Sequence, residues 1–231
     1  MDEAKARTRQ QILEAAAGIL EREGVHAVST RSVAAAAGIR AASLYQFFED
    51  KDGLLAALAV HAFDLYLTEK QALDRTTDPV ADMRLGWDLH VEFGLTHPAL
   101  YLLMFGTSAP GRRPPATDQA RVLLMGYLDR VAAAGRLRVP PPLAADLVVA
   151  AITGVVTTLI GTPAGDRDPE LSTRTRELLV DALVADAGVA AEPGLAPLAL
   201  ALDAAVAGRE DLPLRPVETA LLRDWLDRLA R

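Results

Sequence analysis

Apolar residues recur at helical spacing along most of the chain, and glycine or proline separates one apolar segment from the next. Near the N-terminus this pattern predicts a short helix that ends at Gly38, followed by a second that runs from about Ala41 to Phe47. Gly38 suits the turn because it can adopt the left-handed backbone conformation that follows a helix. Thr30 suits the N-cap, since its hydroxyl can accept a hydrogen bond from an unpaired backbone N–H. Two helices joined in this way form a helix-turn-helix, which predicts binding to DNA.

The pattern beyond residue 55 predicts helices only, because no hairpin signal interrupts it. Asp50 can cap a helix that reaches about Leu73, and the prolines and glycines of residues 106–115 predict an exposed loop. The remaining helices are expected at about 79–97, 98–105, 116–134, 142–160, 169–187, 195–207 and 217–229.

The segment from Leu147 to Ile160 is apolar around more of its circumference than one core face requires. One side is expected to pack within the chain and the other against a partner subunit. A central helix in a monomer is the alternative. The apolar run falls short of the roughly 20 residues that span a bilayer, so we expect a buried helix of a soluble protein.

Composition favours a helical protein, because 51% of the residues are apolar and only 5% are aromatic. The chain contains no cysteine, so disulfides and thiolate metal sites are excluded. The first residues lack the apolar core of a signal peptide, and we expect a cytoplasmic protein.

Net charge argues against DNA binding, since the formal value is −7. Residues 1–55 have seven basic and eight acidic side chains, and the remainder has 17 basic and 23 acidic. Neutralisation of phosphates supplies most non-specific affinity, so we expect weak binding to random DNA and dependence on a few well-placed contacts. Lys5, Arg7 and Arg9 could form a basic arm or an ordinary solvated terminus.

Signatures of common enzymes are absent from the sequence, which has no G-x-S-x-G, G-x-x-x-x-G-K or G-x-G-x-x-G motif. The four histidines have no metal-ligand spacing, so surface or partly buried histidines are expected, and a metal site built from distant segments is the alternative. We predict no enzymatic activity, cofactor or bound metal.

A set of positions between Arg9 and Leu55 follows a known pattern: Arg9, Ile12, Leu13, Ala15, Ala16, Leu20, Gly24, Thr30, Val33, Ala34, Ala37, Gly38, Ile39, Ser43, Leu44, Tyr45, Phe48, Lys51, Leu54 and Leu55. In these positions the chain resembles the DNA-binding domain of the TetR (tetracycline-repressor) family, over roughly residues 7–58. The resemblance implies an all-α fold with an N-terminal three-helix helix-turn-helix DNA-binding domain at 1–55. A larger helical ligand-binding and dimerisation domain follows at 56–187, and a C-terminal helical extension at 188–231 is expected to pack on it.

The resemblance implies roles for individual residues. Tyr45 and Lys51 match positions that grip phosphates, and Lys51 stands at a helix N-terminus, where backbone amides attract anions. A core aromatic is the alternative for Tyr45. Phe47 stands where the family commonly has histidine or tyrosine and offers no hydrogen bond, so Arg40 and Gln46 are the main candidates for base readout. The predicted DNA-binding set is Thr30, Arg31, Arg40, Ala41, Ser43, Tyr45, Gln46, Phe47 and Lys51.

The last two helices of the ligand domain form a four-helix bundle between protomers in TetR-like proteins, and 142–160 and 169–187 would be those helices here. The predicted interface residues are Leu147, Ile152, Val155, Val156, Leu159, Leu179 and Leu183. The amphipathic final helix is expected to dock on its own ligand domain, with a place in the dimer interface as the alternative.

A TetR-like protein is expected to release DNA when a small molecule fills the larger domain. The residues predicted to line that pocket are Trp87, His90, Val91, Gly94, Tyr101, Met104, Phe105 and Met125. The lining predicts an apolar or aromatic effector that accepts or donates a hydrogen bond at His90 or Tyr101; a simple core is the alternative. We thus predict a ligand-responsive regulator, a repressor, that binds a pseudo-palindromic operator as a homodimer. The other hypothesis is a helical small-molecule-binding or interaction module whose helix-turn-helix no longer binds DNA.

Overall fold

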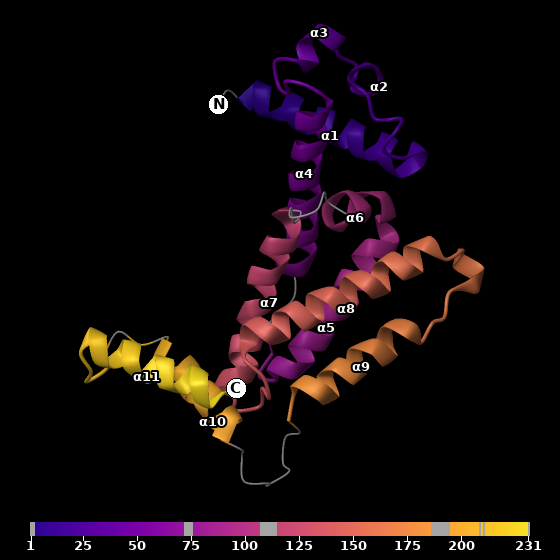
Figure 1. Ribbon diagram of the computed structural model, residues 1–231. Helices are drawn as coiled ribbons and strands as arrows, with labels where there is room; N and C mark the ends of the chain where they lie inside the picture. The colour runs from indigo at the N-terminus through magenta and orange to yellow at the C-terminus, as the bar shows by residue number, and fades with distance from the viewer. Residues whose placement is uncertain are drawn as a thin grey trace. The chain divides into compact units, whose positions relative to one another are not determined.

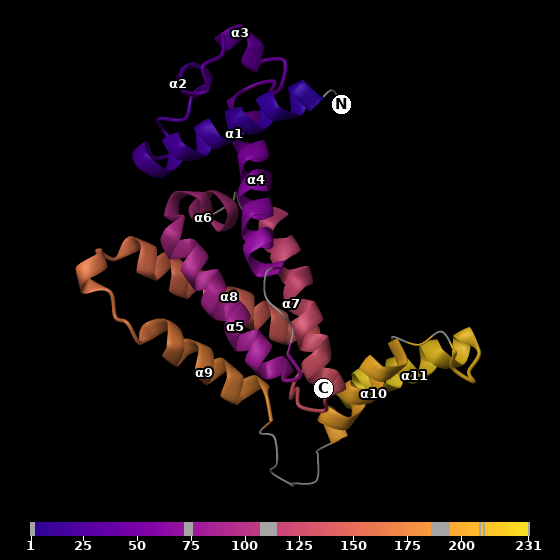
Figure 2. The same cartoon turned by 180° about the vertical axis from the view of Figure 1, so that it is seen from behind.

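The computed structural model describes residues 3–71, 76–106, 115–185, 195–207, 209 and 211–230 (Figures 1 and 2). Helices account for the regular structure of these residues, and a single antiparallel bridge pairs Leu137 with Val184. The predicted all-α fold is confirmed. The helices are α1 (Glu3–Glu23), α2 (Thr30–Ala36), α3 (Ala41–Leu44), α4 (Lys51–Gln71), α5 (Pro79–Thr96), α6 (Pro98–Phe105), α7 (Pro115–Ala133), α8 (Pro141–Gly161), the 3-10 turn η1 (Ala164–Asp166), α9 (Leu171–Leu183), α10 (Leu195–Ala207) and α11 (Pro216–Leu229).

The chain divides into two compact units. The first comprises residues 1–73, 92–118 and 159–161, and the second comprises residues 74–91, 119–158 and 162–231. Helices α5, α7 and α8 contribute residues to both units. Compact units do not define independently folding domains, so the predicted domain limits after residues 55 and 187 stay predictions.

The first unit is held together by the apolar face of α1 and by an aromatic cluster. Helix α1 crosses α4 steeply in both views (Figures 1 and 2). Ring centroids lie 5.2 Å apart for Tyr66 on α4 and Phe93 on α5, and 4.7 Å apart for Tyr101 and Phe105 on α6. Tyr66 and Phe105 join the two pairs at 6.4 Å, so α4, α5 and α6 share one aromatic core. The buried residues of α1 are Ile12, Leu13, Ala16, Ile19 and Leu20.

Polar contacts join α5 to α9 in the second unit. The Arg84 guanidinium donates to the Glu177 carboxylate, with an Nη2–Oε2 distance of 2.8 Å. The indole N–H of Trp87 donates to Ser172 Oγ at 3.0 Å. Both contacts bridge residues more than 80 positions apart in the sequence, so they fix the register of two helices that sequence spacing alone cannot align.

A buried carboxylate joins the start of α5 to α7. Asp82 is 4% exposed and accepts hydrogen bonds from Arg130 Nη1 at 2.5 Å and from Thr76 Oγ1 at 2.7 Å. Burial alone would raise the pKa of Asp82, but the hydrogen bonds from Thr76 and Arg130 lower that pKa below its ordinary value. The carboxylate is therefore ionised and fully partnered at neutral pH.

Helix α8 has one buried and one exposed face. It is 21 residues long, and by length and composition it could cross a membrane. The prediction that its apolar run is too short was wrong, because the helix begins at Pro141, before the run. Part of α8 is buried within the chain, on the face formed by Val148, Ile152, Val155, Val156 and Leu159. The opposite face is exposed and includes Leu143, Leu147, Ala150, Gly154 and Thr158, and Asp146 lies exposed beside Leu143 and Ala150.

The C-terminal helices α10 and α11 lie side by side in both views and form a helical hairpin (Figures 1 and 2). The Arg223 Nε–H donates to Asp203 Oδ1 at 2.9 Å and ties one helix to the other. The apolar core of the hairpin is small and consists of Ala199, Leu200, Leu226 and Ala230, with Leu222 packed against it.

Helix positions agree with the sequence predictions apart from three local differences. The second helix of the helix-turn-helix ends at Leu44 rather than Phe47, and α7 begins at Pro115, within the expected loop. Helix α9 ends at Leu183, short of the predicted limit, because Val184 adopts an extended conformation and pairs with Leu137. Leu73, residues 107–114 and residues 186–194 lie outside the described residues.

Candidate nucleic-acid interface

The first helix of the helix-turn-helix is capped by Ser29. Its side-chain oxygen accepts from the Ser32 N–H at 3.0 Å, and the Ser32 oxygen accepts from the Ser29 N–H at 3.0 Å, which makes a capping box. The prediction of Thr30 as the N-cap was wrong by one residue, because the backbone is extended at Ser29 and already helical at Thr30. The Thr30 hydroxyl is therefore not needed for capping.

The turn after α2 has the geometry that the sequence predicted. Gly38 has a φ of +67°, and the Ile39 N–H donates to the Ala34 carbonyl at 3.0 Å. Gln11 on α1 donates from Nε2 to the Ala37 carbonyl at 3.0 Å. The turn is thus fixed both by its own backbone and by the preceding helix.

Helix α3 is a single turn that is positioned by two buried neighbours, Leu44 and Phe48. Such a short helix has no stability of its own, so packing must hold it. Arg40, Ala41 and Gln46, in and beside this helix, are exposed, whereas Ser43 and Phe47 are half-buried.

The residues predicted to contact phosphates flank this short helix. Tyr45 is 56% exposed, so the alternative of a core aromatic is excluded, and its hydroxyl lies 3.5 Å from Thr30 Oγ1. Lys51 is the first residue of α4, and its Nζ donates to the Val25 carbonyl at 3.4 Å. Asp50 caps the same helix by accepting from the Gly53 N–H at 2.7 Å. Arg31 is exposed as well.

Two cations of α1 lie over aromatic rings of the helix-turn-helix. Lys5 Nζ is 5.8 Å from the centroid of the Phe47 ring, and Arg9 Cζ is 5.6 Å from that of Phe48. Both distances are within the range of a cation–π interaction. The sequence left the role of Lys5 open, and no local pattern indicates a contact across 42 positions. The Lys5 charge thus lies beside the helix-turn-helix, over the Phe47 ring.

The segment that contains the helix-turn-helix matches a known protein family. Residues 12–58 match the sequence model of the family described as bacterial regulatory proteins, tetR family. The N-terminal domain belongs to the TetR family. The TetR-family match covers the whole of α2, the turn at Gly38, α3 and the first part of α4.

Solved structures extend the TetR-like fold to most of the chain. A TetR-family regulator from Pectobacterium atrosepticum is 20% identical, with a TM-score of 0.65 over 80% of this chain and 99% of its own. One from Marinobacter aquaeolei VT8 is 23% identical, with a TM-score of 0.60 over 80% of this chain and 100% of its own. A protein of unknown function from Rhodococcus sp. RHA1 is 25% identical, with a TM-score of 0.65 over 77% and 96%. The fold is that of TetR-family transcriptional regulators.

The residues predicted to bind an effector belong to both units of this TetR-like chain. Gly94, Tyr101, Met104 and Phe105 are buried in the first unit. In the second unit, Trp87, His90 and Val91 are buried and Met125 is half-buried. Trp87 already donates its N–H to Ser172, and the Tyr101 and Phe105 rings are in contact. The effector site stays a prediction.

The residues predicted to form a dimer interface differ in exposure. Leu147 is exposed and Leu179 is half-buried. The other five predicted residues are buried inside a single chain: Ile152, Val155, Val156, Leu159 and Leu183. Leu178 on α9 is the more accessible neighbour, with 71% of its surface exposed. A partner subunit would therefore meet the exposed face of α8 and the outer face of α9 first.

One carboxylate, which no sequence pattern indicates, links α1 to α6. Glu21 accepts from the Ala99 N–H at 3.2 Å and from the Leu100 N–H at 3.0 Å, so it caps the N-terminus of α6. Negative charge at this end of a helix is stabilising. Pro98 marks the start of α6 in the sequence, but nothing local indicates a partner 78 residues away.

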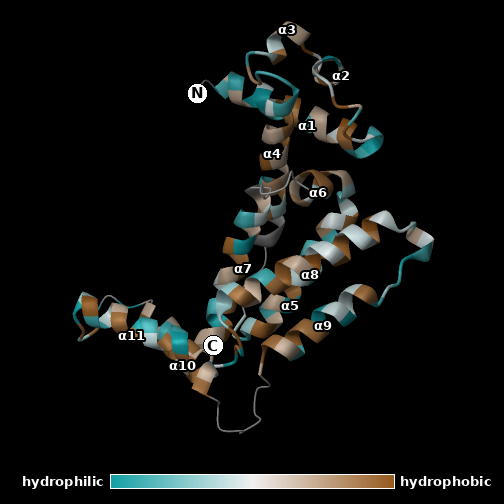
Figure 3. Ribbon diagram, viewed as in Figure 1, coloured by the Kyte–Doolittle hydropathy of each residue, from teal (hydrophilic) through white to brown (hydrophobic). Residues whose placement is uncertain are grey.

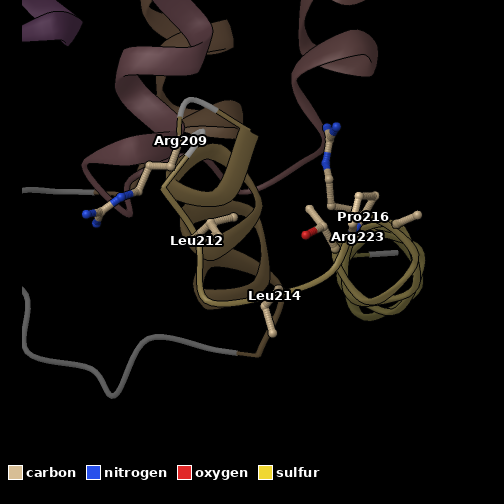
Figure 4. A pocket seen from close by; sticks show the side chains of 7 residues that line it. Arg209, Leu212, Leu214, Pro216 and Arg223 are labelled. Atoms are coloured by element: carbon tan, nitrogen blue, oxygen red, sulfur yellow. The ribbon is translucent and has the colours of Figure 1, made fainter.

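The C-terminal hairpin contains a hollow of about 400 Å³ near the turn between its helices (Figure 4). Figure 4 shows the Arg209 and Arg223 side chains pointing in different directions at its rim. Arg209 pairs with Asp211 and Arg223 with Asp203, so neither cation is reserved for a ligand. The hollow is lined by Arg209, Leu212, Leu214, Pro216, Thr219, Ala220 and Arg223.

Proposed function

We propose that the protein is a transcriptional regulator that binds a pseudo-palindromic DNA site as a homodimer. The observation that carries the proposal is the exposed edge of the helix-turn-helix. Arg40 and Gln46 are exposed there, Arg40 just before and Gln46 just after the single turn of α3, which Leu44 and Phe48 anchor in the core. Exposed hydrogen-bonding side chains on a rigidly held helix are what readout of the major groove requires.

The flanking residues suit phosphate contacts. Thr30 and Tyr45 have hydroxyl groups 3.5 Å apart and can donate to one phosphate, and Lys51 stands at the N-terminus of α4. Lys5, held over Phe47, adds a second cation in each chain. In this proposal Arg40 and Gln46 select the bases, Arg preferring guanine and Gln adenine, while the flanking groups set the position of the domain.

Dimerisation would use the exposed face of α8 together with α9. Leu147, Ala150 and Gly154 are exposed in succession along one face, and Leu178 protrudes from α9. Small residues allow close approach of two helices, and an exposed apolar face is stabilised by a partner. A two-fold dimer would place two recognition helices roughly 34–36 Å apart, or a multiple of that distance.

The effector in this proposal is a small apolar or aromatic molecule that releases DNA, so that the protein acts as a repressor in the cytoplasm. Helix α6 offers the connection to the DNA-binding helices, because Glu21 of α1 caps it and the aromatic cluster packs it against α4. A shift of α6 on effector binding would therefore move α1 and α4, the two helices that flank the helix-turn-helix.

A second candidate is a helical ligand-binding module that no longer binds DNA. Residues 1–55 favour it through their eight acidic against seven basic side chains, and Ala41 and Phe47 offer no hydrogen bond to a base. The two candidates differ in one property, which is sequence-specific affinity for duplex DNA.

Selection of bound duplexes from a random library, followed by anisotropy titration, tests the proposal. A pseudo-palindromic consensus is expected. Gln46→Ala should relax the preference at one base position in each half-site at a cost of about 1–3 kcal/mol, because one base pair loses its partner. Lys51→Ala should weaken all sequences about equally. If no sequence is enriched, the ligand-binding module is the better description.

A further inference from the structure

Glu21 of α1 accepts hydrogen bonds from the free amides at the start of α6. Pro98 is the first residue of α6 and has no N–H, and the Tyr101 N–H already donates to the backbone carbonyl of the N-cap residue at 2.8 Å. The Ala99 and Leu100 N–H groups remain. They donate to the two carboxylate oxygens of Glu21, at 3.2 Å and 3.0 Å. One side chain of α1 therefore completes the N-terminus of another helix.

Helix α6 depends on this cap from α1. Its N-cap residue is His97, whose side chain makes no capping hydrogen bond in the described part of the chain and whose ring lies 5.1 Å from that of Phe93. Leu100 is buried, and Ala99 and Glu21 are half-buried, so the contact is partly shielded from water. Without Glu21, two partly buried amides would lose these acceptors, which is unfavourable.

Helix α6 gives α1 a fixed support within the first unit. Figure 3 shows apolar residues along α6, where Leu100 and Met104 are buried, and the Phe105 ring lies 6.4 Å from that of Tyr66 on α4. Helix α1 contacts both α4 and α6. Apolar contacts are non-directional, whereas hydrogen bonds have preferred directions. The two hydrogen bonds to Glu21 therefore fix the angle of α1 on α6.

The angle of α1 determines the position of the helix-turn-helix, because α1 holds it at several points. Arg9 Cζ lies 5.6 Å from the Phe48 ring centroid, and Gln11 donates to the Ala37 carbonyl at 3.0 Å. From Glu21 to Arg9 the helix extends about 18 Å, at about 1.5 Å per residue. A rotation of α1 by about 15° about its Glu21 end would move Arg9 by about 5 Å.

The spacing of two DNA half-sites is sensitive to displacements of this size. One added base pair moves the half-sites apart by about 3.4 Å and turns one relative to the other by about 35°. Each DNA-binding domain of a two-fold dimer would have to move by about 2 Å and turn by about 17° to follow. A fixed α1 prevents this adjustment.

We infer that Glu21 is a positioning residue that makes the protein select one spacing of its half-sites. With the Glu21 carboxylate on α6, the helix-turn-helix is held at one angle and one spacing fits the dimer. Without it, the angle varies and neighbouring spacings are accepted. The inference rests on the proposed function, binding of a dimer to two half-sites, and it concerns the protein without an effector.

Duplexes that differ only in spacing test the inference. They contain the selected half-sites at the selected distance, one base pair closer and one base pair farther. The unchanged protein should bind either altered duplex about 10-fold more weakly or worse, whereas Glu21→Ala should lose no more than about 3-fold. The preferred bases within each half-site should stay the same. Glu23→Ala is the matched control, since this carboxylate is exposed at the same end of α1, and it should keep the full spacing penalty.

Glu21→Gln gives a second test, which also serves if the alanine variant does not fold. The amide keeps one acceptor oxygen and loses the charge, so its spacing penalty should lie between those of the unchanged protein and Glu21→Ala. A full spacing penalty in the Glu21 variants, or an equal relaxation in Glu23→Ala, overturns the inference. Equal weakening on all three duplexes would mean that Glu21 only stabilises the fold, and this result would overturn it as well.

Hydrogen exchange tests the contact without DNA. The Ala99 and Leu100 amides should exchange faster in Glu21→Ala than in the unchanged protein and in Glu23→Ala. Equal protection in all three proteins would show that Glu21 does not hold α6, which overturns the inference. If a consensus is selected but every spacing is tolerated, this inference fails alone. If no sequence is selected, the regulator proposal fails together with it.

Discussion

At the scale of single residues, Phe47 has a role that its chemistry alone does not indicate. Its ring lies 5.8 Å from the Lys5 ammonium, so it positions a charge where a hydrogen-bonding side chain is absent. A cation–π contact at a partly exposed site contributes about 0.5–1 kcal/mol. Local sequence could show only that Phe47 lacks a hydrogen bond, because the contact with Lys5 requires α1 to pack beside α3.

Phe47→Ala and Lys5→Ala should each lower DNA affinity about 2- to 5-fold, and the double variant should lower it little further. Phe47→Tyr keeps the ring and is the matched control, with affinity close to that of the unchanged protein. Anisotropy titrations of the four proteins on one duplex measure the coupling. Fully additive losses would show that Lys5 and Phe47 act independently.

At the scale of elements, Gly38 is required by its backbone conformation and not by a lack of space for a side chain. A Cβ built at Gly38 or at Gly126 would meet nothing within 4 Å, but only Gly38 has a positive φ, +67°. Gly38→Ala should lower the free energy of unfolding by about 1–2 kcal/mol through backbone strain. Gly126→Ala, in the middle of α7, should raise it by up to about 1 kcal/mol. Urea denaturation of both variants measures the contrast, and similar effects of the two substitutions would contradict it.

The junctions of α5 with α7 and with α9 should be sensitive to acid. Asp82 and Glu177 both have a pKa below the ordinary value, Asp82 through hydrogen bonds from Thr76 and Arg130 that outweigh its burial, and Glu177 chiefly through the hydrogen bond from Arg84. A lowered pKa in the folded state means stabilisation that is present above about pH 4 and is lost as the pH falls through the folded-state pKa.

Asp82→Ala should therefore lower the free energy of unfolding by about 1–3 kcal/mol at pH 7, because Arg130 and Thr76 lose their buried partner. The variant should also lose less stability than the unchanged protein between about pH 5 and pH 2. Denaturant midpoints across this pH range measure both effects. Parallel pH profiles for the two proteins would show that Asp82 does not contribute to the acid dependence.

Elements were predictable where their signals are local. Gly38, Pro98 and Pro142 marked helix limits that the structure confirms to within two residues. The end of α3 at Leu44 and the end of α9 at Leu183 were not predictable, because tertiary packing limits the first and the bridge from Val184 to Leu137 limits the second. The contact between Glu21 and the N-terminus of α6 joins residues 78 positions apart. Such a contact produces no periodic pattern in the sequence.

At the scale of the whole molecule, the helical class and the TetR-like DNA-binding domain were evident from the sequence, but the division into two units was not. Helices α5, α7 and α8 each contribute residues to both units, so no linker or change of composition marks the division. The sequence also could not identify the exposed surface of α8 that was predicted to bind a partner subunit. The apolar pattern of α8 shows that two faces must be covered, but it cannot tell which of them the chain itself covers. The structure assigns Val156 to the inner face and Leu147 to the outer.

The acidic balance of the chain makes a quantitative prediction for DNA binding. If Lys5 and Lys51 are the cations that meet phosphates, a dimer neutralises four of them, and log K should fall with log salt with a slope of about −3.6. Lys51→Ala should reduce the magnitude of that slope by about 1.8, because both copies lose one contact. Gln46→Ala is the matched control, since a neutral side chain that reads a base should leave the slope unchanged. Titrations at several salt concentrations on the selected duplex give all three slopes. A slope steeper than about −6 would mean that Arg31 and Arg40 also bind phosphates, and Arg40 would then lose its assigned role in base readout.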